Sequence, residues 1–308
     1  MADNFMNEDR SLEENMKMAS LLELIRNSLD EKKYPGTAEA LERLIGQMSS
    51  GVVTPLYCAG VLMEADATGK MPEDVASLCI DIYEKEVKKG SFEAMCNLGY
   101  LYYTGRGGEQ SFEKAFELFN EAACQSDAEA EEDVAYCYYY GRGVEQNYEK
   151  AYKYFVKGAL KQRLTSYYKL GDMYRYGLFV EKDEDEAFRI YDMVYHTMDE
   201  DSMKSMAADV AFRLGDCFFE GIGTEQNYDL AMMFYNNAER LFTKRYMEGD
   251  FFIRSNLEKC IHRQFEARMM ISEQMPDYDW VNIPGWLESE SGIRKAQRIK
   301  SAEENMGS

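Results

Sequence analysis

Histidine and cysteine, the residue types that most often bind transition metals or act in nucleophilic catalysis, are few in this 308-residue chain. The two histidines, His196 and His262, stand at no metal-ligand spacing from a cysteine or from each other. Seven cysteines lie at irregular spacing, which favours buried free thiols over disulfides. The acidic run 181–186 lacks the alternating Asp pattern of a calcium loop. A Cys–His nucleophile pair stays open, but the sequence assigns no catalytic residue, no metal ligand and no cofactor.

One glycine-rich segment, Gly105–Gly108, has the composition of a phosphate-binding loop. No predicted strand precedes it, and similar loops follow at Gly141 and Gly221. The aromatic residues before the loop recur with it: residues 102–107 match 138–143 and 174–177 at a spacing of 36 residues, and 218–223 after an eight-residue insertion. A fixed period of this length predicts stacked helical hairpins, in which the loop is a turn between two helices.

Each predicted hairpin repeats the same local signals. The second helix starts with a residue that caps helices well and has an acidic residue two positions later; the caps are Ser111, Asn147, Asp183 and Asn227. Small residues recur within the first helix, at Gly99, Ala135, Gly171 and Gly215, and predict close approach of a neighbouring helix backbone. Aromatic residues at the end of this helix are predicted to wedge between helices: Tyr102, Tyr138, Tyr174 and Phe218.

This pattern resembles the Sel-1-like repeat, a relative of the tetratricopeptide repeat. Residues 130–159 carry it most fully, at Ala130, Val134, Ala135, Tyr138, Gly141, Gly143, Val144, Asn147, Lys150, Ala151 and Ala159. Residues 94–123 match as well, with Gly108 where valine is usual, and residues 166–195 and 210–238 match more loosely. The resemblance covers about half of the chain. It implies an all-α fold, a right-handed α-solenoid of helix-turn-helix repeats with terminal capping helices.

We expect four parts along the chain. Residues 1–53 are predicted to be N-terminal capping helices and 54–90 a degenerate repeat. Four repeats follow over 91–245, with an insertion near 195–209, and a C-terminal helix and tail occupy 246–308. Within these parts the pattern predicts three further helices, over 12–29, 37–48 and 251–273, and an extended segment pinned by aromatic residues over 275–286.

The charge of the chain restricts its partners. The net charge is −21, and all of it lies before residue 240, since residues 240–308 carry 11 charges of each sign. An acidic body repels phosphate backbones, which argues against nucleic acid and favours a basic or neutral protein or peptide partner. We see no signal peptide and no apolar run that would span a membrane. With the cysteine pattern, this predicts a cytoplasmic protein.

A candidate binding surface follows from the predicted hairpins. One stripe of the first helix varies between repeats while the core positions do not, which is expected if a ligand or solvent meets it. Ten residues of this stripe form the predicted partner-binding groove: Asn97, Tyr100, Asp133, Tyr136, Tyr140, Lys169, Asp172, Tyr176, Arg213 and Asp216. Asn97, Lys169 and Arg213 would bind a carboxylate or the backbone of an extended peptide. Plain surface variation is the alternative explanation.

The function expected from this resemblance is that of an adaptor or scaffold, not of an enzyme. It would capture a peptide or a partner protein in the concave groove, and the family implies roles in assembling signalling or membrane-associated complexes. Some secreted relatives, with one cysteine pair in each repeat, are associated with penicillin binding or β-lactam cleavage; the repeats here lack such pairs. That hydrolase class and an effector acting inside a host cell are the two alternatives.

Overall fold

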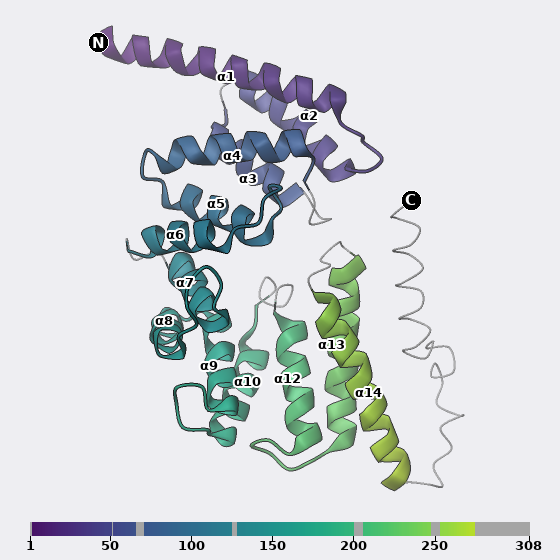
Figure 1. Cartoon of the computed structure of the whole chain (residues 1–308). Helices are drawn as coiled ribbons and strands as arrows, with labels where there is room; N and C mark the ends of the chain where they lie inside the picture. The colour runs from purple at the N-terminus through teal and green to yellow at the C-terminus, as the bar shows by residue number, and fades with distance from the viewer. Residues whose placement is uncertain are drawn as a thin grey trace. The chain divides into compact units, whose positions relative to one another are not determined.

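The computed structural model describes residues 2–50, 52–65, 71–124, 128–199, 206–247 and 253–274. Within these residues the chain forms thirteen α-helices and no strand, arranged as helix-turn-helix repeats, so the fold is an all-α solenoid. The chain divides into two compact units, unit 1 over 1–161 and unit 2 over 162–308 (Figure 1). This division falls between the second and third repeats, inside the expected block 91–245.

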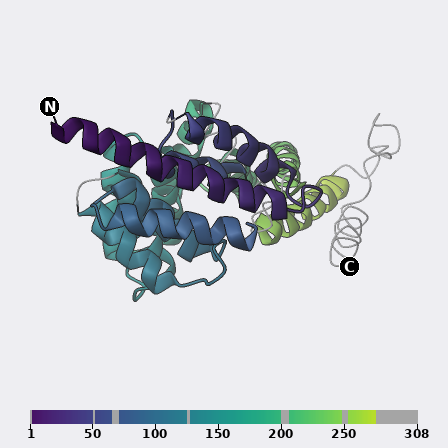
Figure 2. The same ribbon diagram turned by 90° about the horizontal axis from the view of Figure 1, so that it is seen from above.

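In unit 1, each helix packs on the helix that follows it along the chain. The long helix α1 packs along α2 at the N-terminal end of unit 1 (Figure 2). The helices of unit 1 are α1 (Ala2–Ser28), α2 (Pro35–Ser49), α3 (Pro55–Ala65), α4 (Glu73–Val87), α5 (Phe92–Thr104), α6 (Phe112–Ala123), α7 (Ala128–Tyr140) and α8 (Tyr148–Leu160).

Unit 2 continues the hairpin pattern and ends on a single helix. Its described helices are α9 (Leu164–Tyr176), α10 (Glu184–Thr197), α12 (Ala207–Glu220), α13 (Tyr228–Met247) and α14 (Arg254–Gln274). The expected helix over 251–273 is thus α14, while the predicted extended segment over 275–286 and the tail lie outside the described residues. Of the insertion near 195–209, residues 200–205 also lie outside them.

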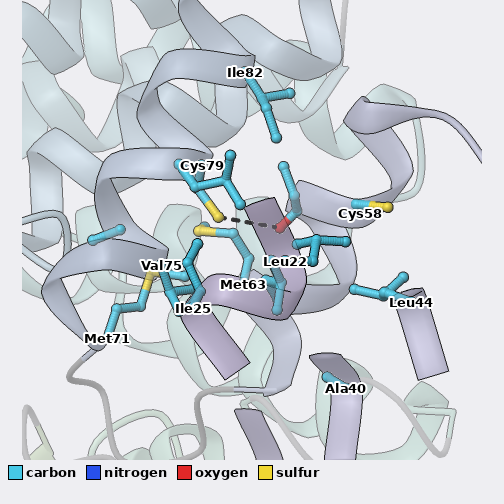
Figure 3. Packing of buried hydrophobic residues seen from close by; sticks show 14 of the residues in the cluster. Leu22, Ile25, Ala40, Leu44, Cys58, Met63, Met71, Val75, Cys79 and Ile82 are labelled. Carbon is cyan, nitrogen blue, oxygen red and sulfur yellow. Dashed lines mark hydrogen bonds between the residues drawn. The ribbon is translucent and has the colours of Figure 1, made fainter. Parts of the chain in front are cut away.

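The N-terminal helices and the degenerate repeat share one hydrophobic core. Leu22 of α1, Leu44 of α2 and Cys58 of α3 are fully buried in it (Figure 3). Val75 and Cys79 of α4 close the same cluster, and the Cys79 thiol points to the carbonyl oxygen of Ala59 at 3.8 Å. The helices predicted over 12–29 and 37–48 therefore pack directly on the degenerate repeat.

The predicted helix starts are confirmed atom by atom. Each of the four capping side chains accepts a hydrogen bond from the backbone N–H three residues later: Ser111 from Lys114, Asn147 from Lys150, Asp183 from Glu186 and Asn227 from Leu230. The glycine that ends the first helix is left-handed at φ +71° for Gly105 and +74° for Gly221, which favours glycine there. The glycine-rich loops are turns between helices.

The mid-helix glycines make room for a ring and not, as predicted, for a neighbouring backbone. A Cβ added at Gly99 would lie 2.6 Å from the Phe119 ring, and one at Gly215 would lie 2.5 Å from the Tyr235 ring. The ring comes from the second helix of the same hairpin in both cases. Two of the four predicted aromatic wedges contact rings of neighbouring helices. Tyr138 lies 5.4 Å from Phe116, centroid to centroid, and stacks on Tyr154 of α8, and Phe218 lies 5.6 Å from Phe188 and stacks on Phe234.

Candidate protein-binding face

The first helix of each hairpin, here called the leading helix, carries the predicted stripe. In unit 1 the stripe lies on α5 and α7 and comprises Asn97, Tyr100, Asp133, Tyr136 and Tyr140, which we call the tyrosine face. The exposed fraction is 46% for Tyr100 and 44% for Tyr140, and the other three residues are half-buried. Tyr136 stacks on Tyr140, with 6.1 Å between their ring centroids. Large aromatic rings therefore reach the surface here.

Arginines from the glycine-rich loops join the leading helices of unit 1. Arg142, just after α7, lies 4.9 Å from the Tyr140 ring and 5.1 Å from the Tyr103 ring of α5. It also hydrogen-bonds the Tyr103 hydroxyl. Arg106, one repeat earlier, donates to the carbonyl oxygen of Met63 in α3 at 2.9 Å and lies 6.0 Å from the Tyr100 ring. The Arg106 hydrogen bond thus connects the loop after α5 to α3, and the cation–π contacts of Arg142 connect α5 to α7.

The stripe of unit 2 differs from the expectation. Lys169 and Asp172 are 3% exposed and Asp216 is 7% exposed, so three of its five predicted binding residues lie in the interior of the unit. Tyr176 is 57% exposed, with Arg175 over its ring, and Arg213 is partly buried. The amphipathic pattern assigned polar residues to the outside, whereas the buried ones here bond to each other. Binding of a partner by the stripe stays a prediction.

Asp172 is the centre of the first half of this interior network. Arg213 of α12 donates two hydrogen bonds to the Asp172 carboxylate, from Nε to Oδ1 at 2.5 Å and from a terminal nitrogen to Oδ2 at 2.7 Å. Lys169 lies 3.2 Å from Oδ2, and the Tyr191 hydroxyl of α10 donates to Oδ1 at 2.8 Å. Every carboxylate oxygen therefore has two donors, which compensates its removal from water.

The electrostatics follow from these contacts. Burial would raise the pKa of Asp172, but the charges of Arg213 and Lys169 outweigh it and, with the hydrogen bonds from Arg213 and Tyr191, hold that pKa well below its usual range. Burial and the neighbouring Asp172 carboxylate raise the pKa of Tyr191 well above its ordinary value. Tyr191 thus stays a neutral donor to a charged acceptor.

Asp216 repeats the arrangement one hairpin later. The Tyr235 hydroxyl of α13 donates to it at 2.8 Å, and Arg175 of α9 donates to it at 3.1 Å. Arg175 and Arg263 of α14 also bind Glu220, at 3.4 and 2.5 Å. These residues tie α9, α12 and α14 together, and we call the whole set the ion-pair cluster: Lys169, Asp172, Arg175, Tyr191, Arg213, Asp216, Glu220, Tyr235 and Arg263.

The sequence analysis missed Arg175, Tyr191, Tyr235 and Arg263, although a signal for two of them was present. One position of the leading helix and one of the second helix change together along the five hairpins. Where the leading helix has an acidic residue at this position, the second helix has a tyrosine, and where the leading helix has a tyrosine, the second helix has a phenylalanine. The pairs are Glu64 with Tyr83, Tyr100 with Phe119, Tyr136 with Phe155, Asp172 with Tyr191, and Asp216 with Tyr235. A tyrosine hydroxyl is retained only where a carboxylate stands opposite in the repeat.

In the first of these pairs, Glu64 with Tyr83, the two side chains form no hydrogen bond. The Tyr83 side chain is fully buried, and its hydroxyl has no hydrogen-bond partner. Glu64, the residue opposite in the repeat, is exposed instead. It lines an open cavity of about 270 Å³ between α2 and α3, together with Val61, Glu39 and Arg43. The degenerate repeat therefore has both members of the pair without the bond between them.

Other kinds of site find no support in the described part of the chain. No group of three or more histidine, cysteine, aspartate or glutamate side chains is placed there to hold a metal ion. None of its helices combines the length and apolar character of a membrane span. All seven cysteines are free thiols, five of them buried.

The repeats can now be compared with known proteins. The family model of the Sel1 repeat matches residues 92–127, 128–162, 165–193 and 208–241, one match for each hairpin from α5–α6 to α12–α13. A search of curated proteins finds no match.

A search of solved structures also finds Sel1 repeat proteins. A Sel1 repeat protein from Oxalobacter formigenes is 22% identical with a TM-score of 0.52, over 75% of this chain and 96% of the other. The protective antigen c5321 of uropathogenic Escherichia coli strains, which displays an SLR fold, is 19% identical with a TM-score of 0.49, over 85% of this chain and 55% of the other. With four repeats matched and the helical hairpins formed as the repeat requires, this chain contains four Sel1 repeats between residues 92 and 241.

Proposed function

We propose that this protein is an adaptor or scaffold that captures an extended segment of a partner protein on the tyrosine face of unit 1. Sel1 repeat proteins generally serve as scaffolds for protein–protein interaction and are typically not catalytic. The alternative of a penicillin-active enzyme depended on one cysteine pair in each repeat, whereas the seven cysteines here are free thiols. We further propose a basic partner, in keeping with the net charge of −21, and a cytoplasmic location, which suits free thiols.

One observation carries the choice of unit 1. Both units place polar or aromatic side chains on the same positions of their leading helices, but they use them differently. In unit 2, Asp172, Asp216 and Arg213 bond to other residues of the same unit. In unit 1, two rings of the stripe, Tyr100 and Tyr140, expose nearly half of their surface, whereas of the five stripe residues of unit 2 only Tyr176 is exposed. Tyrosine supplies a large contact area and a hydroxyl at small entropic cost, which is why it is enriched in protein interfaces.

The mechanism we propose is docking of an extended backbone across α5 and α7. The rings of Tyr100 and Tyr140 would pack against apolar or cationic side chains of the segment, and Asn97 would hydrogen-bond its backbone. Tyr136 supports Tyr140 by stacking on it. Arg142 holds α5 and α7 together through Tyr103 and Tyr140, so the two helices present their rings as one surface.

The test is a comparison of partners recovered by three immobilised proteins from native lysate. The variant Y100A/Y140A removes both exposed rings. The control L160A removes an 80% exposed side chain at the end of α8, outside the tyrosine face. We expect Y100A/Y140A to lose the proteins that the wild type and L160A both recover, with helix content unchanged by circular dichroism. Equal recovery by all three folded proteins would refute the tyrosine face as the binding surface.

A further inference from the structure

The last described helix of the chain exposes a short apolar stripe. One side of α14, on which Leu257 and Ala267 are buried, packs on α13 and α12. On another side, Phe265 is 56% exposed and Met269 is 46% exposed. Ile261, which is half-buried, precedes Phe265 by four residues. Residues four apart are neighbours on a helix, so the last three side chains form one surface, which we call the α14 stripe.

The place of this stripe in the stack is unusual. Each hairpin of a repeat array is covered by the next one, and the terminal repeat needs a polar outer face to stay soluble. Of the described residues after α13, all but Ile253 belong to α14. Single apolar side chains are ordinary on a protein surface, but neighbouring ones at the end of a stack indicate that something covers them.

The sequence that follows α14 contains side chains suited to this role. Residues 275–308 lie outside the described part of the chain, and both tryptophans of the protein fall among them. The segment 278–287 carries six large aromatic or aliphatic residues: Tyr278, Trp280, Val281, Ile283, Trp286 and Leu287. Side chains of this size gain most from burial against other apolar groups, and tryptophan and tyrosine gain it while a polar edge still reaches water. The segment thus supplies an apolar surface next to the α14 stripe in the sequence.

The length of chain between α14 and Trp280 fits a contact with the stripe. The helix ends at Gln274, and Pro276, a residue that breaks helices, follows two positions later. A chain that turned back there would advance about 3.3 Å per residue, so Trp280 would return by about 13 Å. The same distance along α14 covers about nine residues. This places the indole level with the helix between Phe265 and Met269.

The charges next to the stripe favour the same contact. Asp277 and Asp279 precede the first tryptophan, and Arg268 of α14 is half-buried three residues after Phe265, hence on the same side of the helix. Burial lowers the pKa of Arg268, and a carboxylate beside it would favour its charged form. The sulfur of Met269 in turn suits contact with an aromatic ring. Both the apolar and the acidic residues of the segment therefore have counterparts on this side of α14.

We propose that residues 278–287 of this chain dock on the α14 stripe, with the Trp280 indole against Phe265 and Met269. The occupant is a segment of the same molecule, and its short tether gives it a high effective concentration at the stripe. It covers the last helix of the array as the next hairpin covers each earlier one. This inference goes beyond the proposed function. The tyrosine face lies in unit 1 and α14 in unit 2, so either can fail without the other.

The test uses tryptophan fluorescence of the full chain. W286F leaves Trp280 as the only tryptophan, so the emission reports the surroundings of that residue alone. F265A/M269A, made in W286F, removes the exposed side chains of the stripe. The control M193A/M233A, also made in W286F, truncates two methionines that are 40% and 52% exposed on the second helices α10 and α13.

We expect Trp280 of the native protein to emit at shorter wavelength, and to be quenched less by acrylamide, than in urea at every protein concentration. F265A/M269A should lose both differences and M193A/M233A should keep them, with helix content unchanged by circular dichroism. In the chain that retains Trp286, W280A should speed amide exchange in α14 about 10-fold, because it uncovers the helix.

Three results would overturn the proposal. The first is emission from native Trp280 that equals emission in urea. The second is a shift that F265A/M269A leaves intact, or unchanged exchange of α14 in W280A. The third is a shift that appears only as the protein concentration rises, which would place a second copy of the chain on the stripe.

Discussion

Replacing single buried tyrosines by phenylalanine should have opposite effects in different repeats. Y191F, Y235F and Y83F each remove one oxygen from a side chain that is buried at the same repeat position. In unit 2 that oxygen donates to a carboxylate at 2.8 Å, from Tyr191 to Asp172 and from Tyr235 to Asp216. In the degenerate repeat, the Tyr83 hydroxyl has no hydrogen-bond partner.

The expected magnitudes follow from these contacts. A hydrogen bond to a charged group contributes about 1.5–3 kcal/mol. Asp172 retains Arg213 and Lys169 when Tyr191 is changed, so we expect Y191F to lower the unfolding free energy by about 1–2 kcal/mol. A buried hydroxyl without a partner costs about 1–3 kcal/mol. Y83F should therefore raise the unfolding free energy, by about 1 kcal/mol.

The measurement is urea unfolding monitored by hydrogen exchange and mass spectrometry. Two compact units need not unfold together, so one global transition would mix their stabilities. Exchange of peptides from α10 reports the effect of Y191F, and exchange of peptides from α4 reports that of Y83F. A loss of protection in Y83F as large as that in Y191F would refute the reasoning. It would show that Tyr83 has an acceptor in solution, for which Glu64 is placed at the matching repeat position.

Three further predictions concern packing, acid stability and thiol reactivity. G215A should destabilise unit 2 by about 1–3 kcal/mol in urea unfolding, because the added Cβ would lie 2.5 Å from the Tyr235 ring. As the control, G46A should stabilise unit 1 by about 0.5–1 kcal/mol, because a Cβ added at Gly46 would have no atom within 4 Å. The depressed pKa of Asp172 stabilises the fold above about pH 5, and this stabilisation is lost as pH falls through that pKa. D172N should lower the unfolding free energy at pH 7 by about 3 kcal/mol. Between about pH 5 and 2, the unfolding free energy of D172N should then fall less steeply than that of the wild type. Native iodoacetamide labelling at pH 8 should modify the exposed Cys124 and spare the five buried cysteines, so labelling of all seven in the folded protein would contradict the burial of the rest.

The repeat architecture was predictable because each of its signals is local. The cap at Ser111 and the left-handed glycine at Gly105 depend on the few residues around them, and both were found as predicted. Their recurrence at a fixed spacing then specifies hairpins that stack. The reason for the mid-helix glycines was wrong in detail: the ring that Gly215 accommodates comes from α13, and periodicity does not show which atom fills the space.

The stripe of unit 2 could not be predicted from the pattern of its own helix. Asp172 is polar, and an amphipathic pattern places polar residues in solvent. Its burial depends on Arg213, 41 residues later, and on Tyr191, 19 residues later. The paired change of Asp with Tyr at two successive repeats carried this information, since most buried hydroxyls are hydrogen-bonded to an acceptor.

The two units thus hold their leading helices by different chemistry. In unit 2, ion pairs link the leading helices, so the polar groups of the stripe are satisfied inside the unit. A partner that bound these groups would have to break buried charge pairs, at a cost of about 3–5 kcal/mol each. Where Arg106 and Arg142 stack on tyrosines, as in unit 1, the link uses one side of each ring. Tyr100 and Tyr140 keep nearly half of their surface exposed beside these links, so a partner can contact them without breaking a buried ion pair. Binding on unit 1 would then add contacts and remove none.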